Sequence, residues 1–328
     1  MDKRNVKRGT KRKTRKAARK KQRTVVLAVI VIAVLAIAGA FIGWRIVQGS
    51  AGSSGEGMET AIMEKYLASA VIAAGPDNSA YIENGRVTVL GQNDSGQCET
   101  GEWENIVAVA LGDDHTIGLT ADGTLVFAGD NTYGQCSLTA GDKKAVAIAA
   151  SSFASYAVFE DGSVAMAGNG PVSGAKIAGA ENVAVVAAAD SHVVLLKKDG
   201  TVIAMGDNTV GECGVTGWSG VTMIAAGYQT SVVLDSKGVV HIAGETSYAQ
   251  SEMDGTAKVS SISAGGNFCI AVLKNGTAVG AGSNWSGQIS VEEWRGVQAV
   301  ACGYKHAIAL TKDGSRLFSG ANNRGQQG

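Results

Sequence analysis

Two patterns of apolar positions divide this chain. Residues 25–44 form an unbroken apolar run of 20 residues, VVLAVIVIAVLAIAGAFIGW, which as a helix would be about 30 Å long and match the hydrocarbon core of a bilayer. From about residue 58 onward, short apolar stretches alternate with polar turns. The first pattern predicts a transmembrane helix over residues 24–45, and the second predicts many short β-strands.

The strand-rich part consists of repeats. A two-residue turn signal recurs with spacings of 38 or 39 residues between its glycines, and a second glycine follows each turn glycine six residues later. Internal repetition of this kind determines the fold before any local detail does. The seven turns are Asn84-Gly85, Asp122-Gly123, Asp161-Gly162, Asp199-Gly200, Lys237-Gly238, Asn275-Gly276 and Asp313-Gly314.

Each repeat contains three strand-like stretches. In the second repeat these are residues 107–111, 115–120 and 124–128, with the turn Asp122-Gly123 between the second and the third. Asn-Gly and Asp-Gly favour type I′ hairpin turns, because both central residues of such a turn have positive φ. The polar loop and linking stretch after the third strand leave room for a fourth short strand.

Seven such units predict an all-β fold, a seven-bladed β-propeller over residues 58–328, preceded by one N-terminal transmembrane helix. Small equal sheets cover one another when they pack radially, and a linear solenoid is the structural alternative. The last repeat lacks its linking stretch, while an extra segment at 58–69 precedes the first repeat. Tyr66 lies nine residues before Gly75, as Trp103 lies nine before Gly112. This segment is therefore predicted to complete the last blade and lock the ring.

The charges are unevenly distributed although they sum to zero. Residues 1–23 hold 13 of the 29 Lys and Arg residues, whereas residues 46–328 hold 15 basic and 28 acidic residues. The positive-inside rule places residues 1–23 in the cytoplasm as a basic tail. It makes residues 24–45 a single-pass signal anchor of the cell membrane and the propeller extracytoplasmic. The segment 46–57, rich in Gly and Ser, is predicted to be a flexible linker.

Two other interpretations of the N-terminal region remain. The basic tail could be a nucleic-acid or nuclear-import patch, or residues 1–51 could be a long cleavable signal peptide ending near Ala51. The acidic charge of residues 46–328 argues against nucleic acid as a partner of the folded part, since phosphate binding needs a positive field.

The repeats resemble a known family. The pattern G-x-x-H-x-x-x-L-x-x-D-G-x-x-x-x-x-G-x-N-x-x-G-Q occurs at residues 112–135 and, with substitutions, at 189–212 and 303–326. It resembles the regulator of chromosome condensation repeat over about 270 residues, and the resemblance implies a seven-bladed propeller. The layout is similar to membrane-anchored, bacterial-type members of that family. The third repeat carries an extra residue around Pro171, so blade three is expected to be the least regular.

The residues most able to do chemistry have structural interpretations. His115, His192 and His306 share one position of the repeat, and in-phase residues of a ring lie too far apart to share a metal unless they line the axis. We expect them to bond backbone groups. The five cysteines are interpreted as small buried residues without disulfides. No nucleophile elbow, P-loop or zinc motif occurs, so the sequence predicts no catalytic residues, no metal and no cofactor.

Strand direction predicts which face binds. One face should display two loops per repeat and the other mainly tight turns. Seven of the chain's 18 aromatic residues fall in the loops of the first face, and Tyr, Trp and Arg are the residues that dominate binding interfaces. Phe268 is the one most suited to the alternative, a cap on a blade core. The predicted ligand-binding face comprises Asp113, Asp114, Tyr133, Phe153, Asp190, Tyr228, Tyr248, Trp285, Tyr304, Lys305 and Arg324.

These observations predict a non-enzymatic, monomeric cell-surface propeller that binds a protein or a cell-wall polymer. The repeats are also similar to those of secreted propeller-type β-lactamase inhibitory proteins. This resemblance implies binding through aromatic residues in the loops of one face. The alternative is guanine-nucleotide exchange on a small GTPase, the activity of the repeat family's founder, which rests on analogy of fold. A propeller enzyme is a third class, which would need acids such as Asp113, Asp114 and Asp190 to converge at the axis.

Overall fold

Each repeat forms one antiparallel sheet of three strands. The computed structural model describes residues 54–245, 247, 248 and 250–328, so the basic tail and the predicted transmembrane segment lie outside the described residues. Within the described part, no helix is long and apolar enough to cross a membrane.

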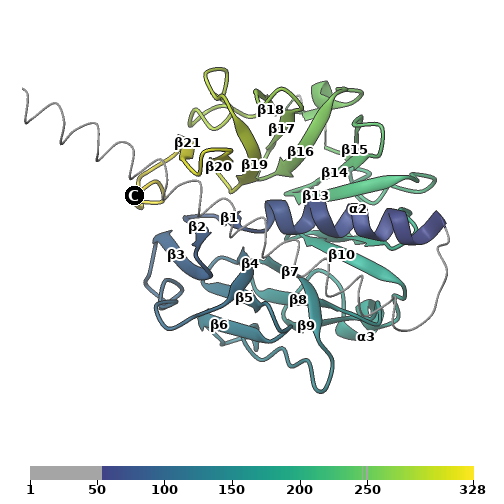
Figure 1. Cartoon of the computed structure of the whole chain (residues 1–328), viewed down its shortest axis with the longest axis vertical. Coiled ribbons are helices and arrows are strands. Elements are labelled where there is room, and N and C mark those ends of the chain that lie inside the picture. The colour runs from purple at the N-terminus through teal and green to yellow at the C-terminus, as the bar shows by residue number, and fades with distance from the viewer. Residues whose placement is uncertain (1–53, 246, 249) are drawn as a thin grey trace, which may run out of the picture.

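The seven sheets follow one another around a ring, as Figure 1 shows. In chain order the strands are β1 (Ile72–Ala74), β2 (Asn78–Glu83) and β3 (Arg86–Gly91); β4 (Ile106–Leu111), β5 (His115–Thr120) and β6 (Leu125–Gly129); β7 (Ala145–Ser151), β8 (Ala154–Phe159) and β9 (Val164–Gly168); β10 (Val183–Ala188), β11 (His192–Lys197) and β12 (Val202–Gly206); β13 (Val221–Gly227), β14 (Thr230–Asp235) and β15 (Val240–Gly244); β16 (Val259–Ala264), β17 (Phe268–Leu273) and β18 (Ala278–Gly282); β19 (Val297–Cys302), β20 (His306–Thr311) and β21 (Arg316–Gly320).

The seven-bladed propeller is confirmed. The first strand of every blade is innermost and contacts the first strand of the next blade, and β1 contacts β19 to close the ring. The middle strands, such as β8 and β11, are buried almost along their whole length, because a neighbouring blade covers each of their faces. The expected fourth strand is not formed in any of the seven sheets of the described chain.

The turns differ from the prediction in all blades but the first. Asn84 and Gly85 both have positive φ, as a type I′ turn requires. In the second blade only Gly123 does, and its N–H donates to the carbonyl of Thr120 at 3.0 Å. These hairpins therefore have three-residue loops that end on a left-handed glycine. Asp122 supports its turn by accepting a hydrogen bond from the N–H of Thr124 at 3.3 Å, so it is a turn residue as expected.

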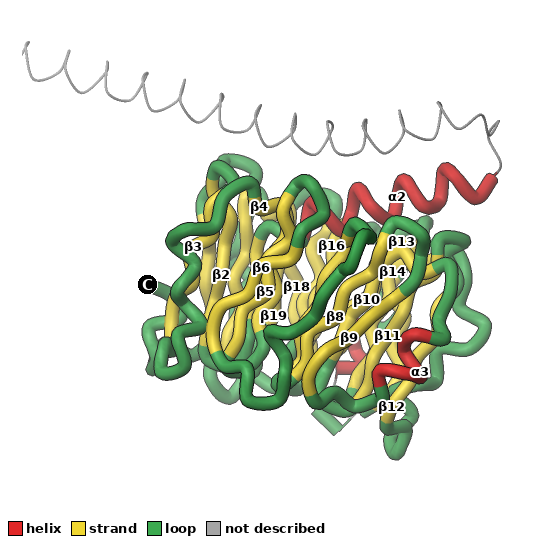
Figure 2. Tube along the Cα trace, turned by 90° about the horizontal axis from the view of Figure 1, so that it is seen from below, coloured by secondary structure: helices red, strands yellow, loops and turns green. Residues whose placement is uncertain are grey.

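The segment before the first blade is a helix and not a strand. Helix α2 (Ser54–Ser69) crosses one face of the ring and covers one end of its central channel, as Figures 1 and 2 show. The prediction that residues 58–69 complete the last blade is wrong. Trp103 packs into a blade core, but Tyr66 belongs to a stretch rich in Ala, Met, Glu and Leu, which are strong helix formers. The helix begins four residues before the expected boundary at residue 58.

Helix α2 is tied to the inner strands of several blades. The Tyr66 hydroxyl accepts a hydrogen bond from the N–H of Ile148 on β7 at 2.8 Å. The Lys65 ammonium donates to the carbonyl of Ser260 on β16 at 2.9 Å. An inner strand has one edge without a partner strand, and the helix satisfies polar groups on these edges that would otherwise lie unpaired at the channel.

Blade three has an irregular segment after its third strand. The short helix α3 (Gly174–Ala178) follows β9, and the side chain of Ser173 caps its N-terminus. A second irregularity, which the sequence did not predict, is the 3-10 helix η1 (Gln250–Met253) after β15.

Candidate functional site

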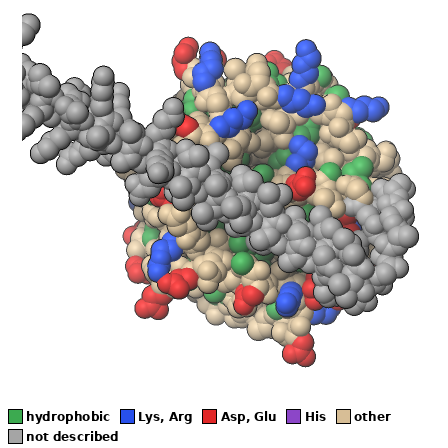
Figure 3. Space-filling view, in the orientation of Figure 1, with side chains coloured by type: hydrophobic (Ala, Val, Ile, Leu, Met, Phe, Trp, Pro, Cys, Tyr) green, Lys and Arg blue, Asp and Glu red, His purple; other side chains and the backbone are tan. Residues whose placement is uncertain are grey.

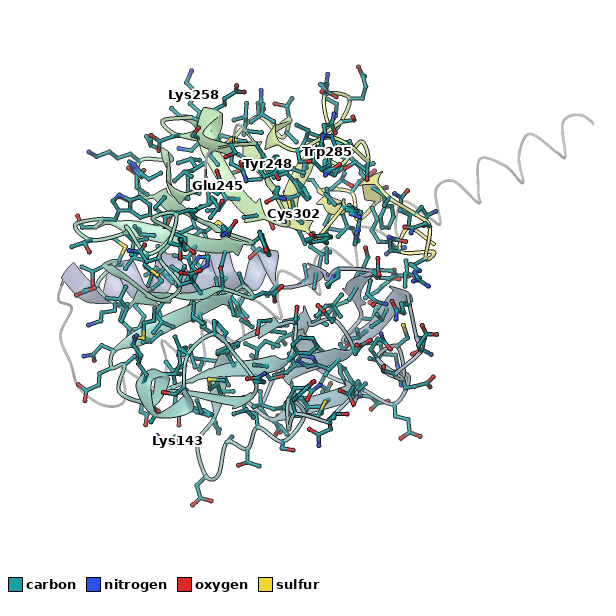
Figure 4. All side chains as sticks on the ribbon, turned by 180° about the vertical axis from the view of Figure 1, so that it is seen from behind. Lys143, Glu245, Tyr248, Lys258, Trp285 and Cys302 are labelled. Atoms are coloured by element: carbon teal, nitrogen blue, oxygen red, sulfur yellow. The ribbon has the colours of Figure 1, made fainter. Side chains whose placement is uncertain are left out.

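The two faces of the ring are built differently. Helix α2 lies on the face that carries the hairpin turns, which we call the turn face: Glu59 of the helix pairs with Lys198 beside the β11–β12 turn at 3.1 Å. The opposite face carries the loops between the first and second strands and the loops after the third strands, and we call it the loop face. Figure 4 shows the molecule from this side. The predicted binding residues therefore all lie on the face opposite α2.

A cavity of about 300 Å³ occupies the axis of the ring. The inner strands that line it present mainly small side chains, such as Ala110, Ala150 and Ala226. Tyr66 and Ser69 of α2 close it at the turn face, while Asp113, Asp190, Tyr228 and Tyr304 lie at its loop-face mouth. The cavity is therefore accessible to a ligand from the loop face.

Six of the predicted aromatic residues are exposed on the loop face. They are the only large exposed apolar side chains of the described residues apart from Val279. Trp285 is 86% exposed and Tyr133 is 55% exposed, whereas Phe268 is 1% exposed and belongs to a blade core. The alternative interpretation thus holds for Phe268. The exposed set consists of Tyr133, Phe153, Tyr228, Tyr248, Trp285 and Tyr304.

Adjacent blades bring four of these aromatic residues into two pairs. Tyr133 after β6 lies beside Phe153 between β7 and β8, with their ring centroids 5.3 Å apart. Tyr248 after β15 meets Trp285 after β18 edge to face, at 5.9 Å and 81°. Figure 4 shows Tyr248 and Trp285 together on this face. Paired aromatic side chains offer a large and rigid contact surface, and binding a ligand to them costs little side-chain conformational entropy.

Buried glutamines hold the loops in place. Gln135 is fully buried, and its amide oxygen accepts a hydrogen bond from the N–H of Tyr133 at 2.9 Å. Gln288 accepts in the same way from the N–H next to Trp285, that of Ser286, at 2.8 Å. Because these side chains are fixed inside the blade, the loop aromatics are presented by rigid supports, as a binding site requires.

A glycine ends each third strand, where the backbone of one loop passes close to the backbone of the other loop of the same blade. Gly129 has a φ of 103°, and a Cβ there would lie 2.2 Å from the carbonyl oxygen of Asp114. Only glycine fits so close an approach with a positive φ.

The acidic residues of the mouth are linked across three blades. The Ser152 hydroxyl donates to Asp113 at 2.7 Å, and its backbone N–H donates to Asp190 at 3.1 Å. Burial raises the pKa of the Asp113 carboxyl; the bond from Ser152 opposes this, and repulsion from Asp190, Asp114 and Asp77 raises the pKa further. Lys305 and Arg324 are exposed on the same face, and the Lys305 ammonium lies 5.6 Å from the ring centroid of Tyr304.

The three in-phase histidines join neighbouring blades. His115, His192 and His306 are fully buried, and each Nε2 bonds a serine hydroxyl of the next blade. These partners are Ser155 at 3.0 Å, Ser231 at 2.9 Å and Ser79 at 2.9 Å, respectively. The structural role is as expected, and the serine side chains are partners that the prediction did not include. Burial lowers the pKa of His115 and His306 to about 4, so both are neutral at physiological pH.

The cysteines are all free. Cys269 and Cys302 are buried, whereas the three in-phase cysteines are only half-buried. The thiol of Cys136 donates to the carbonyl of Asp130 at 3.1 Å, and Cys98 and Cys213 bond the equivalent carbonyls. Burial raises the pKa of the Cys136 thiol to about 11, so it is a loop support and not a nucleophile. Within the described residues, no group of three or more His, Cys, Asp or Glu is placed to hold a metal ion.

Two features of the site were missed by reasoning from sequence. The serine partners could have been found, because a serine follows the histidine position in each repeat after one that contains histidine: Ser79, Ser155 and Ser231. The pairing of Tyr248 with Trp285 had no signal in the sequence, since it depends on how far the loops of adjacent blades lean toward each other.

Comparison with known proteins agrees with this geometry. Residues 106–135 and 297–326 match the family model described as the regulator of chromosome condensation (RCC1) repeat. No curated protein sequence matches the chain.

Several solved structures share the fold. Prp20p from Saccharomyces cerevisiae, whose structure is reported with its binding to Gsp1p and histones, has 15% identity and a TM-score of 0.59 over 80% of this chain and 84% of its own. The CRINKLY WD40 ectodomain of the Arabidopsis thaliana receptor kinase ACR4 has 14% identity and a TM-score of 0.60 over 76% of this chain and 93% of its own. The CR4 ectodomain of Physcomitrella patens has 17% identity and a TM-score of 0.58 over 76% and 72%. The chain thus carries regulator of chromosome condensation repeats and folds as a seven-bladed propeller similar to these structures.

Proposed function

We propose that the protein is a non-enzymatic recognition propeller, anchored in the cell membrane, that binds a partner through its loop face. The observation that carries the proposal is that the six exposed aromatic side chains of the described residues all lie on one face. Exposed aromatic side chains that are grouped on one surface mark interaction sites. The partner is proposed to be a protein or a cell-wall polymer.

The position of α2 supports an orientation in which the loop face points away from the membrane. The described chain begins with this helix on the turn face, and the predicted anchor at residues 24–45 precedes it by eight residues in the sequence. An anchor on that side would leave the loop face directed away from the membrane. The propeller would then display its aromatic residues toward the cell exterior.

Guanine-nucleotide exchange is the second candidate, because Prp20p shares the fold and is reported to bind Gsp1p. It requires a cytosolic propeller. Protease treatment of intact cells and of lysed cells separates the two functions: cleavage of the propeller on intact cells supports a surface function. Cleavage only after lysis, with a surface protein digested as a positive control, would support the cytosolic alternative.

Site-specific photocrosslinking in the native host tests the binding face. A benzoylphenylalanine at position 133 on the loop face should give adducts, and the same residue at position 68, exposed on α2, should not. Trp285→Ala with Tyr248→Ala should reduce partner binding, whereas Val279→Ala, which alters an exposed residue in the middle of β18, should leave it unchanged. Adducts from position 68 alone, or equal binding by all variants, would contradict the proposal.

A further inference from the structure

The loop face is strongly acidic. The loops between first and second strands carry Asp77, Asp113, Asp114 and Asp190 against one cation, Lys305. The first five residues after each third strand add Asp94, Asp130, Asp207 and Glu245 against one cation, Arg324. On the turn face, Lys and Arg side chains lie among the Asp and Glu side chains, as Figure 3 shows. Acidic residues thus outnumber basic ones eight to two in these loops, against twenty to thirteen in the rest of residues 46–328.

The carboxylates at the mouth of the cavity have no cation partner within the described residues: no ion pair with Lys or Arg involves Asp77, Asp113, Asp114 or Asp190. Their bonds within the mouth, from Ser152 and Gln97, come from neutral donors. Burial is the main cause of the raised pKa of the Asp113 carboxyl, and repulsion from Asp190, Asp114 and Asp77 raises that pKa further. A cation bound at this mouth would relieve that repulsion.

Aromatic rings lie beside these charges. Tyr228 and Tyr304 line the same mouth and are exposed. Farther out, the edge-to-face pair of Tyr248 and Trp285 forms a corner next to Glu245, as Figure 4 shows. The face of a Trp or Tyr ring attracts an ammonium or guanidinium group, and Trp does so most strongly. A carboxylate next to two aromatic rings is therefore suited to a Lys or Arg side chain.

We propose that the loop face is a docking surface for a cationic protein segment, one rich in Lys and Arg. This inference rests on the proposed function and narrows it to one class of partner. The segment lies across the face with one basic side chain at the cavity mouth and another at the corner of Tyr248 and Trp285. A polyanionic wall polymer does not fit, because eight carboxylates on this face would repel it.

The proposal is tested with a fluorescein-labelled hexalysine peptide, whose binding to the full-length chain in an uncharged detergent is followed by fluorescence anisotropy. Hexaglutamate serves as the opposite-charge probe. We expect hexalysine to bind, with an affinity that falls as salt is added, and hexaglutamate not to bind. Absence of hexalysine binding at low ionic strength would overturn the proposal.

Matched variants distinguish a site from general attraction between charges. Asp113→Asn with Asp190→Asn should weaken hexalysine binding about tenfold, which corresponds to about 1.4 kcal/mol. Asp142→Asn with Glu292→Gln removes the same net charge from exposed positions that precede β7 and β19 on the turn face, and should change the affinity less than twofold. Equal losses in the two double variants would refute the site.

Two further variants complete the test. Trp285→Leu should weaken binding several-fold while Trp285→Tyr retains most of it, since leucine keeps an apolar contact but has no π face. An equal loss of affinity in both variants would show that the corner of Tyr248 and Trp285 is not part of the binding site. A chain that lacks residues 1–23 should bind hexalysine as the full-length chain does. Binding that appears only in this truncated chain would show that the protein's own basic tail occupies the face, and would refute a separate partner.

The failure of this inference and that of the proposed function are distinguishable. A natural partner that crosslinks at position 133 and depends on Trp285, but is insensitive to Asp113→Asn with Asp190→Asn, would leave the proposed function intact and refute a cationic segment. Specific hexalysine binding without any crosslinked partner on cells would refute the proposed function alone.

Discussion

The hydrogen bond between His306 and Ser79 joins the seventh blade to the first, so it lies where the ring closes. Both side chains are fully buried, and the His306 Nε2 lies 2.9 Å from the Ser79 hydroxyl. Ser79→Ala would leave this nitrogen unpaired, and water cannot replace the hydroxyl in so tight a contact. A buried polar group without a partner costs about 1–3 kcal/mol. We expect the free energy of unfolding to fall by that amount.

The chain contains its own control for this substitution. In blade six the histidine position is occupied by Phe268, and the position that a serine would take in blade seven is Ala307; both lie in one apolar cluster. A Cβ on Gly265 would lie 2.8 Å from Phe268 Cε1, and one on Gly303 would lie 2.6 Å from His306 Cε1. The two rings thus occupy equivalent sites, each beneath a glycine. His306→Phe with Ser79→Ala should therefore recover stability to within about 1 kcal/mol of the parent protein.

Urea unfolding of the parent, the two single variants and the double variant measures the coupling. Circular dichroism and fluorescence should give coincident transitions, because only then is the unfolding free energy well defined. We expect each single substitution to destabilise and the double variant to be more stable than their sum predicts, by about 1–3 kcal/mol. A coupling energy of zero would refute the reasoning, since it would mean that the two side chains act independently.

Three other predictions follow from buried groups. Because the pKa of His115 and of His306 is lowered to about 4 from about 6.5 in the unfolded chain, stability should be intact above pH 6.5 and fall toward pH 4. The slope is about 1.4 kcal/mol per unit for each histidine; His306→Phe with Ser79→Ala should show a shallower profile, and an unchanged one would contradict this. Glu212→Gln should raise the melting temperature by about 2 °C, because the buried Glu212 Oε1 has no partner, while the equivalent Gln135 donates to Asp130 at 2.8 Å; a lower melting temperature would count against it. Tyr66→Phe should lower the unfolding free energy by about 1–2 kcal/mol, since Ile148 loses its bond to the hydroxyl; hydrogen exchange at the Ile148 amide measures this, with unchanged protection as the contrary result.

The architecture of the ring was largely predictable, and the helix that covers it was not. Equal spacing between turn glycines implies equal units, and equal units that cannot bury two faces alone must stack. The segment at 58–69 occurs once, so no repetition constrains it. The prediction that it completes the last blade rested on the missing linking stretch of the last repeat and on the position of Tyr66, whereas its composition favours a helix. The hairpin turns show the same limit, because Asp-Gly fits both type I′ turns and three-residue loops.

The candidate site divides in a similar way. Loop positions and their exposure followed from strand direction, which is why Tyr133 and Trp285 were placed on one face from sequence. The sequence did not show that Phe153 would meet Tyr133, or that Tyr248 would meet Trp285. Contacts between side chains of different blades depend on the tilt of each blade and on the conformation of each loop.

The sequence by itself determined how many sheets form, the order in which they follow one another and which residues reach each face, because these properties follow from repeat length and from the alternation of strands. Only the tertiary structure decided what closes the ring and the channel. The bond from His306 to Ser79, the contacts of α2 with β7 and β16, and the acidic mouth around Asp113 join residues far apart in the chain. Closure of the ring brings these residues together, and local sequence patterns do not predict such contacts.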